Sequence, residues 1–352
     1  MGATDAVLQF VCAVLVVAIP AGILTVYGPP RRVRVIGVVV AGLVGAAGSI
    51  AIDVVFSSPV DVPGRTLDAA FTGAIVATVA ILASKRLGTL GGAVFGATWG
   101  LLVFHAVFAA VVGSVPSVVQ TVFGAVDYAG VLATHVAAAA SLLTLYALPV
   151  PPRDHAQPPI TATLARSLCA LALITVGASA WMVGVERVVN VSTGRTLGNA
   201  VAGLVLGAVV WVLIERIAGR PFVPAAIVRG CVVGWASIGL GVAFLSPMAL
   251  VTSTVIATAS GAAIVVRARD SADPNRRGAI GVIIATSTGG VVLALLADGF
   301  GLAATGSTAL VVGQLSAVLA IALGAAALGG LCWVCAAGAI VVSERRREAE
   351  TR

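Results

Sequence analysis

Charge is scarce in this sequence of 352 residues: Asp, Glu, Lys and Arg together make up only 10% of it, against about 25% in soluble domains. Aromatic residues are also few, at 5%, whereas hydrophobic residues reach 59% and the mean hydropathy is +1.10. So little charge cannot cover the surface of a water-soluble fold, which excludes an ordinary soluble domain. The composition therefore predicts a membrane protein.

Residues that bind metals or carry out covalent chemistry are equally sparse. The five cysteines all fall within apolar runs, including the pair Cys332 and Cys335 in "CWVC". This pair has redox-motif spacing, but it lies in a predicted membrane helix with no strand before it, which favours a packing role. The apolar runs contain no nucleophile–base pair and no metal-ligand cluster, so we expect neither an enzyme nor a cofactor.

What the chain does have is a succession of apolar runs, each of about 17–25 residues or longer, which is the length that crosses ~30 Å of hydrocarbon. Divided at the helix breakers, these runs predict an all-α polytopic membrane protein with eleven transmembrane helices. The predicted limits are 7–27, 33–56, 67–84, 90–113, 128–148, 167–185, 196–214, 224–244, 247–266, 279–297 and 307–342. The last run is long enough for its helix to project beyond the bilayer.

The basic residues predict the orientation. With eleven spans, one face of the membrane keeps only Arg65, Arg187 and Arg195 of the 21 Lys and Arg residues, and the rest fall on the other face or in the C-terminal tail. The positive-inside rule then places the C-terminus in the cytoplasm and the N-terminus outside the cell membrane. Topology thus explains the net charge of +7, and no nucleic-acid partner is predicted.

Ionisable groups within apolar spans are functional candidates because each costs about 2.5–3.5 kcal/mol at mid-helix. Asp68 opens the third span and is expected to reach the headgroups. His105 and His135 lie further inside the fourth and fifth spans. Each histidine also fits a neutral core imidazole bonded to a neighbouring carbonyl, and for His105 no surrounding pattern argues otherwise.

The surroundings of His135 form a recognisable pattern. The segment "DYAGVLATH" begins with Asp127 and Gly130 follows three residues later, with His135 at its end. It resembles the Asp-aromatic-Ala-Gly segment of the ammonium transporter/Rhesus (Amt/Rh) family, in which the first of two pore histidines follows the aspartate by eight residues. Eight residues of helix span ~12 Å, too far for contact, so we expect Asp127 to cap the helix near its start.

Further segments resemble the same family in the same order. They are "PAGILTVYGPPRRVR" at 20–34, the third-span segment 71–87, the seventh- and eighth-span region 197–250, "ADP" at 272–274, where the family has Asp-Asp-Pro, and "GQLSAVLAI" at 313–321. Lys85 stands where the family has Glu. The resemblance covers essentially the whole chain, which is therefore identified as a divergent Amt/Rh-like member.

The resemblance implies one membrane domain, 1–352, with a first inverted five-helix repeat at 1–150 and a second at 160–300. A long last helix at 305–342 and a cytoplasmic tail at 343–352 complete it. It also implies a homotrimer in the lipid bilayer with one pore per subunit.

Several pore features of the family are changed here. Phe71 falls on the first of two stacked Phe gates, although an ordinary packing Phe fits equally. No second Phe is found in "SAWMVGVER" (179–187), and the outer Trp of the family's cation site would fall near Val112. Thr286 stands in the place of the second histidine, and "GVLATH" against "GVIIAT" pairs it with His135. Thr286 cannot take a proton at physiological pH, and a bond back to its own helix is the alternative.

Three functions remain open. The first is a passive ammonium or ammonia channel with His135, Thr286 and Phe71 along the path and Asp127 as a structural neighbour. The second is a relative that does not conduct and serves as a sensor or structural subunit. The third is a pore for another small neutral solute. A cytosolic regulatory protein that docks on the basic face is a further possible partner.

Overall fold

The computed structural model describes residues 2–26, 32–56, 62–112, 116–149, 162–267 and 274–350. The exit from the first span at 27–31, the loop 150–161 and the Ala-Asp of the "ADP" motif at 272–273 lie outside the described residues. Within the described ranges every regular element is helical, which confirms the all-α prediction.

Seven helical stretches in the described residues are long and apolar enough to cross a bilayer. They are Ala3–Val26, Val62–Val112, Leu164–Gly184, Thr193–Ile217, Pro247–Arg267, Arg276–Leu296 and Ala309–Glu350. Three shorter apolar stretches accompany them, at Val35–Gly48, Leu132–Ala147 and Ala225–Ile238. Several long apolar helices in one chain make this a polytopic membrane protein.

The N-terminal part of the chain contains the helical turn that carries His135. Its elements are α1 (Ala3–Leu15), α2 (Ala18–Val26), α3 (Arg32–Phe56), α4 (Val62–Trp99), η1 (Gly100–Phe104), α5 (His105–Val112), α6 (Val118–Phe123), η2 (Leu132–Ala137) and α7 (Ala138–Ala147). The elements η1 and η2 are π-helical turns. Short π-helical turns inside α-helices are frequent at functional sites.

The stretch 62–112 is a helical hairpin rather than one straight helix. A straight helix of that length would extend about 75 Å, far more than a bilayer. Gly88 has a left-handed φ of 69° and breaks the helix. A Cβ at Gly92 would lie 2.6 Å from Cα of Ser84, and one at Gly96 would lie 2.6 Å from Cβ of Ala80. These pairs lie four and eight residues to either side of Gly88, so the two arms pack antiparallel, as the predicted third and fourth spans require.

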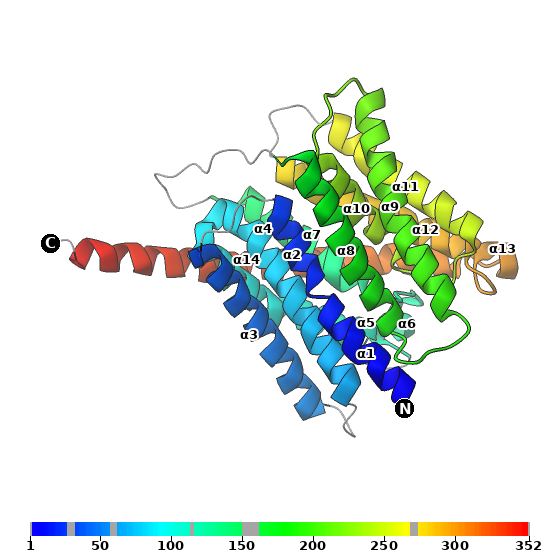
Figure 1. Ribbon diagram of the computed structural model, residues 1–352, viewed down its shortest axis with the longest axis horizontal. Coiled ribbons are helices and arrows are strands. Elements are labelled where there is room, and N and C mark those ends of the chain that lie inside the picture. Colours follow the sequence, from blue (N-terminus) through cyan, green and yellow to red (C-terminus); the bar gives the residue numbers. More distant parts are fainter. Residues whose placement is uncertain are drawn as a thin grey trace.

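The C-terminal part forms the other side of the bundle. Its elements are α8 (Leu164–Gly184), α9 (Thr193–Ile217), α10 (Ala225–Ile238), α11 (Pro247–Arg267), α12 (Pro274–Leu296), α13 (Leu302–Thr305) and α14 (Ala309–Glu350). Helix α10 ends at Ile238, earlier than the predicted limit at 244. Helix α14 runs across the bundle, and its C-terminal end projects well beyond the other helices (Figure 1), as expected from the length of the last apolar run.

Polar contacts sort the connections between helices into two ends. Arg187 pairs with Asp68, Arg195 with Asp298, and the backbone N–H of Val189 with Asp5 at one end. Arg86 bonds to the carbonyls of Tyr146 and Leu148, and Arg220 to that of Val266, at the other. We call the second the basic end and the first the opposite end. Arg187 and Arg195, predicted on the sparsely charged face, both lie at the opposite end.

Candidate functional site

The fifth predicted span begins with a carboxylate cap. Asp127 accepts a hydrogen bond from the backbone N–H of Val131 at 2.8 Å and another from that of Leu132 at 2.7 Å. Gly130 has a φ of 68°, a left-handed conformation that glycine adopts without the steric cost of a side chain. The carboxylate and the glycine together turn the chain into the helix, which is the capping geometry that the sequence predicted for Asp127.

The segment before this helix is held from three sides. The indole N–H of Trp181, on α8, donates to the carbonyl of Ala129 at 2.7 Å. The side-chain amide of Gln314, on α14, donates to the carbonyl of Val126 at 2.8 Å. The N–H groups of Tyr128 and Ala129 donate to the carbonyls of Leu240 and Gly239 at 3.0 Å. The start of the fifth span, which belongs to the N-terminal part of the chain, is therefore fixed by elements of the C-terminal part.

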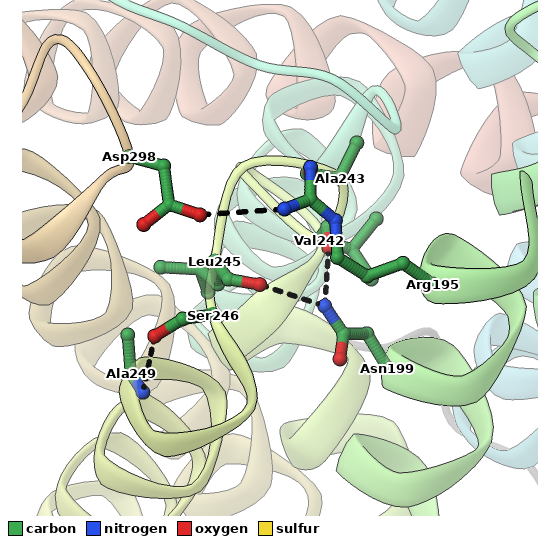
Figure 2. Close-up of polar contacts among 8 residues, drawn as sticks. All are labelled: Arg195, Asn199, Val242, Ala243, Leu245, Ser246, Ala249 and Asp298. Carbon is green, nitrogen blue, oxygen red and sulfur yellow. Dashed lines mark hydrogen bonds and ion pairs between the residues drawn. The ribbon is translucent and has the colours of Figure 1, made fainter. Parts of the chain in front are cut away.

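The irregular loop that follows α10 is itself anchored by α9. Asn199 donates from Nδ2 to the carbonyls of Val242 and Leu245, each at 2.9 Å. Arg195 donates to the carbonyl of Ala243 at 2.6 Å and reaches Asp298 at 3.3 Å (Figure 2). The carbonyls of this loop accept hydrogen bonds from the N–H groups of Tyr128 and Ala129. Helix α9 therefore positions the fifth span indirectly.

His135 lies within η2 and is 6% exposed. Its Nδ1 is 2.8 Å from Oγ1 of the adjacent Thr134, which also lies 3.0 Å from the carbonyl oxygen of Gly130. The imidazole also faces the backbone carbonyl of Val232 on α10, and its ring centroid lies 4.7 Å from that of Trp235 in an edge-to-face arrangement. His135 is therefore enclosed by its own helix and by α10.

A group of stacked aromatic rings lies next to His135. Phe71 and Trp181 stack with parallel planes and ring centroids 3.6 Å apart, and both are completely buried. Phe108 lies 6.2 Å from Phe71, and Trp235 lies 6.5 Å from it, in tilted arrangements. We call Phe71, Trp181, Phe108 and Trp235 the aromatic cluster. It connects α4, α5, α8 and α10, and Trp235 links it to His135.

Sequence reasoning missed both tryptophans of this cluster. Trp181 lies within "SAWMVGVER", where the resemblance implies a second Phe, and Trp235 matches no pore feature that the resemblance implies. An available signal was the rarity of aromatic residues, at 5% of the chain, because a Trp inside an apolar span is then unusual. The outer Trp expected near Val112 has no counterpart there: a Cβ at Gly130 would lie 3.7 Å from both Val112 and Phe108.

Thr286 is fully buried on α12. Its hydroxyl donates to the carbonyl of Val282 in its own helix at 3.0 Å. Helix α12 packs against η2 and α7, but within the residues that the structure describes no hydrogen bond joins Thr286 to His135. The structure thus brings Phe71 close to the surroundings of His135, and it places the hydroxyl of Thr286 in a local backbone bond.

Two other ionisable residues prove to be structural. The expectation that Asp68 reaches the headgroups is wrong, because its side chain is largely buried and pairs with Arg187. His105 is 5% exposed, and its Nε2 lies 3.2 Å from the carbonyl oxygen of Gly45 on α3. No cluster of three or more metal-binding side chains occurs among the described residues.

Solved structures with the same arrangement of helices exist. Mep2 from Candida albicans matches 94% of this chain and 83% of its own, with 14% identity and a TM-score of 0.75. Mep2 from Saccharomyces cerevisiae gives 14% identity, coverage of 94% and 87%, and a TM-score of 0.72. A sensor Amt protein gives 14% identity, coverage of 94% and 92%, and a TM-score of 0.74.

The chain has the Amt fold. No protein-family model and no curated protein sequence matches it, so the likeness rests on the arrangement of helices and not on sequence identity. The fold implied by "DYAGVLATH" and the segments in order with it is thereby confirmed. Within the Amt fold, Phe71 and Trp181 form an aromatic pair beside the only histidine of the fifth span.

Proposed function

We propose that the chain is a divergent Amt/Rh-family member that passes a small neutral species, ammonia, passively through each subunit. The observation that carries the proposal is the stack of Phe71 on Trp181 next to the Trp235–His135 pair, in a chain with the Amt fold. In this proposal the stacked rings close the path in this conformation, and the imidazole adjoins them through Trp235. A solute passes when one of the two rings swings aside.

The proposed topology has eleven spans in two inverted five-helix repeats plus α14. The Gly88 turn divides the stretch 62–112 into two spans, and the three shorter apolar helices supply the rest. We propose that the basic end faces the cytoplasm and that the N-terminus lies outside, in keeping with the positive-inside rule. From the resemblance to the Amt/Rh family we also propose a homotrimer. We further propose that a cytosolic regulatory protein can bind to the basic end.

The surroundings of His135 favour a neutral solute. An ion that leaves water for an apolar passage loses several kcal/mol of solvation. Aromatic rings compensate part of this lost solvation energy only when the cation lies over a ring face. The facing surfaces of Phe71 and Trp181 cover one another and are not open to a cation. With Thr286 in the place of a second imidazole, no His–His pair relays a proton alongside ammonia.

Proteoliposomes test the proposal directly. Ammonium added outside the vesicles should alkalinise their lumen faster than that of empty vesicles. On a solid-supported membrane, the same addition should produce little transient current. In the variant Thr286→His, a second imidazole becomes available, and we expect a current to appear if it reaches His135. A strong, saturable ammonium current in the unmodified protein contradicts the electroneutral mechanism.

A second function is favoured by the same aromatic pair. Phe71 and Trp181 are each 0% exposed and stack at 3.6 Å, a seal that suits a non-conducting sensor, and one protein with this fold is a sensor Amt protein. Trp181→Ala separates the two functions. If the stack is a gate, the unmodified protein already conducts and the variant conducts faster; if it is a permanent seal, only the variant conducts. Challenging the same vesicles with urea and methylamine tests for another neutral solute.

A further inference from the structure

Trp235 carries a buried hydrogen-bond donor that the protein does not use. Its side chain, on α10, is 3% exposed, and its Nε1–H has no hydrogen-bond partner among the described residues. An indole N–H can only donate, and a buried donor without an acceptor bears the full cost of its lost hydration. A solute with a lone pair that reaches this donor would supply the missing acceptor.

The position of Trp235 is what makes this donor relevant to the path. Its ring centroid lies 4.7 Å from that of His135 and 6.5 Å from that of Phe71. It therefore lies against both the imidazole and Phe71, one of the two stacked rings. The other three buried indoles in the cluster or the surrounding core have partners: Trp181 donates to Ala129, Trp99 to Ser141 and Trp211 to Glu215.

The imidazole of His135 already forms hydrogen-bond contacts within the protein. Its Nδ1 is engaged with the hydroxyl of Thr134 at 2.8 Å, and the ring also faces the carbonyl of Val232, one helical turn before Trp235. The indole N–H of Trp235 is thus a second polar group available to a solute at this level, beside the imidazole that the sequence pattern highlights.

We infer that Trp235 donates a hydrogen bond from Nε1–H to the neutral solute and thereby selects ammonia over ammonium. This rests on the proposed function, whose site it deepens. Ammonia has one lone pair and accepts this bond, whereas ammonium has none. An ammonium ion also meets the positive end of the N–H dipole, so the same group that holds ammonia repels its protonated form. Trp235 is a specificity-determining residue in this reading.

The first experiment measures binding and needs no transport. The protein is labelled with ¹⁵N-tryptophan in detergent, and the five indole N–H resonances are recorded, with Trp235 assigned by its absence in Trp235→Phe. Ammonium chloride is added at a fixed total concentration at two pH values that differ tenfold in free ammonia, against matched sodium chloride samples. The Trp235 resonance should shift in proportion to free ammonia. The inference is overturned if it does not shift, or if it follows total ammonium.

A matched control is available on α14. The Nε1–H of Trp333 is also buried and without a partner, but Trp333 makes no ring contact with the aromatic cluster or with His135. Its resonance should stay in place during the same titration. If Trp333 shifts as Trp235 does, the shift at Trp235 reports a general effect of ammonia on the protein, and the inference is overturned.

The second experiment measures ammonia permeation in proteoliposomes. Losing one neutral hydrogen bond should slow permeation about fivefold in Trp235→Phe, while Trp333→Phe keeps the unmodified rate. If unmodified vesicles are no more permeable than empty ones, the proposed transport fails, and the resonance titration still decides whether Trp235 binds ammonia. If transport is present but Trp235→Phe matches the unmodified protein, the inference fails and transport stands.

Discussion

The two histidines inside the bundle look alike in isolation. His105 is 5% exposed and directly follows the π-helical turn η1, and His135 is 6% exposed and lies within the π-helical turn η2. Burial and local backbone geometry therefore do not separate a site residue from a structural one. Their neighbours do separate them.

The surroundings of His105 are those of a helix-packing contact. Its Nε2 lies 3.2 Å from the carbonyl oxygen of Gly45, and a Cβ at Gly48 would lie 2.9 Å from the same nitrogen. His105 thus fills the space between α3 and the hairpin. His135 instead meets Thr134 and the edge-to-face ring of Trp235. One imidazole fills a contact between helices, whereas the other adjoins the aromatic cluster.

The strongest way to break this comparison is to disrupt the hairpin that carries His105. In Gly92→Leu the new Cβ would lie 2.6 Å from Cα of Ser84, and a backbone atom cannot turn aside. We expect a loss of about 3 kcal/mol or more in unfolding free energy, measured by thermal unfolding in detergent. Gly338→Leu is the control, because a Cβ there meets nothing within 4 Å. Equal stability of the two variants would show that the hairpin does not depend on this contact.

The next largest effect concerns the support of His135. Asp127→Ala removes the acceptor of two backbone N–H groups and should cost about 2–3 kcal/mol, seen as a lower midpoint of thermal unfolding. Asp298→Ala removes a half-exposed ion pair with Arg195 and should cost less than about 1 kcal/mol. A loss in Asp127→Ala no greater than that in Asp298→Ala contradicts the capping role.

The histidines themselves can be compared directly. His135→Ala should lower ammonia permeation about tenfold, equivalent to about 1.4 kcal/mol, and leave the proposed trimer intact on native mass spectrometry. His105→Ala should leave permeation unchanged and lower stability by about 2 kcal/mol, because it opens a cavity and frees a carbonyl. The reverse pattern, in which His105→Ala slows permeation and His135→Ala does not, would show that His105 and not His135 lines the path.

The smallest expected effect concerns Thr134, whose hydroxyl positions the imidazole of His135. Thr134→Val keeps the shape of the side chain but loses the contact between its hydroxyl and Nδ1 of His135, at a cost of about 1 kcal/mol. The ¹⁵N resonances of His135 should move, since its tautomer loses a partner. Thr144→Val loses bonds to Ala140 and Ala326 instead, so it should match the stability loss and leave those resonances in place.

The class of the protein and the start of its site can be predicted from the order of its residues. Scarce charge and repeated apolar runs could only be satisfied in a bilayer, so a helical membrane protein followed from composition. The breaker at Gly88 and the Asp127–Gly130 pattern are local, because a left-handed glycine and a side-chain cap act on the nearest few residues. Local rules of this kind can be read from the order of residues.

Contacts between side chains that are distant in the sequence depend instead on how the helices pack. The stack of Phe71 on Trp181 joins residues more than a hundred positions apart, and Trp235 reaches His135 from another helix again. Asp68 likewise finds Arg187 across the bundle. Such contacts depend on how helices rotate and approach one another, and in a chain rich in small residues close packing sets that approach. Apolar periodicity is nearly uniform around such helices, so the sequence did not reveal which faces would be joined.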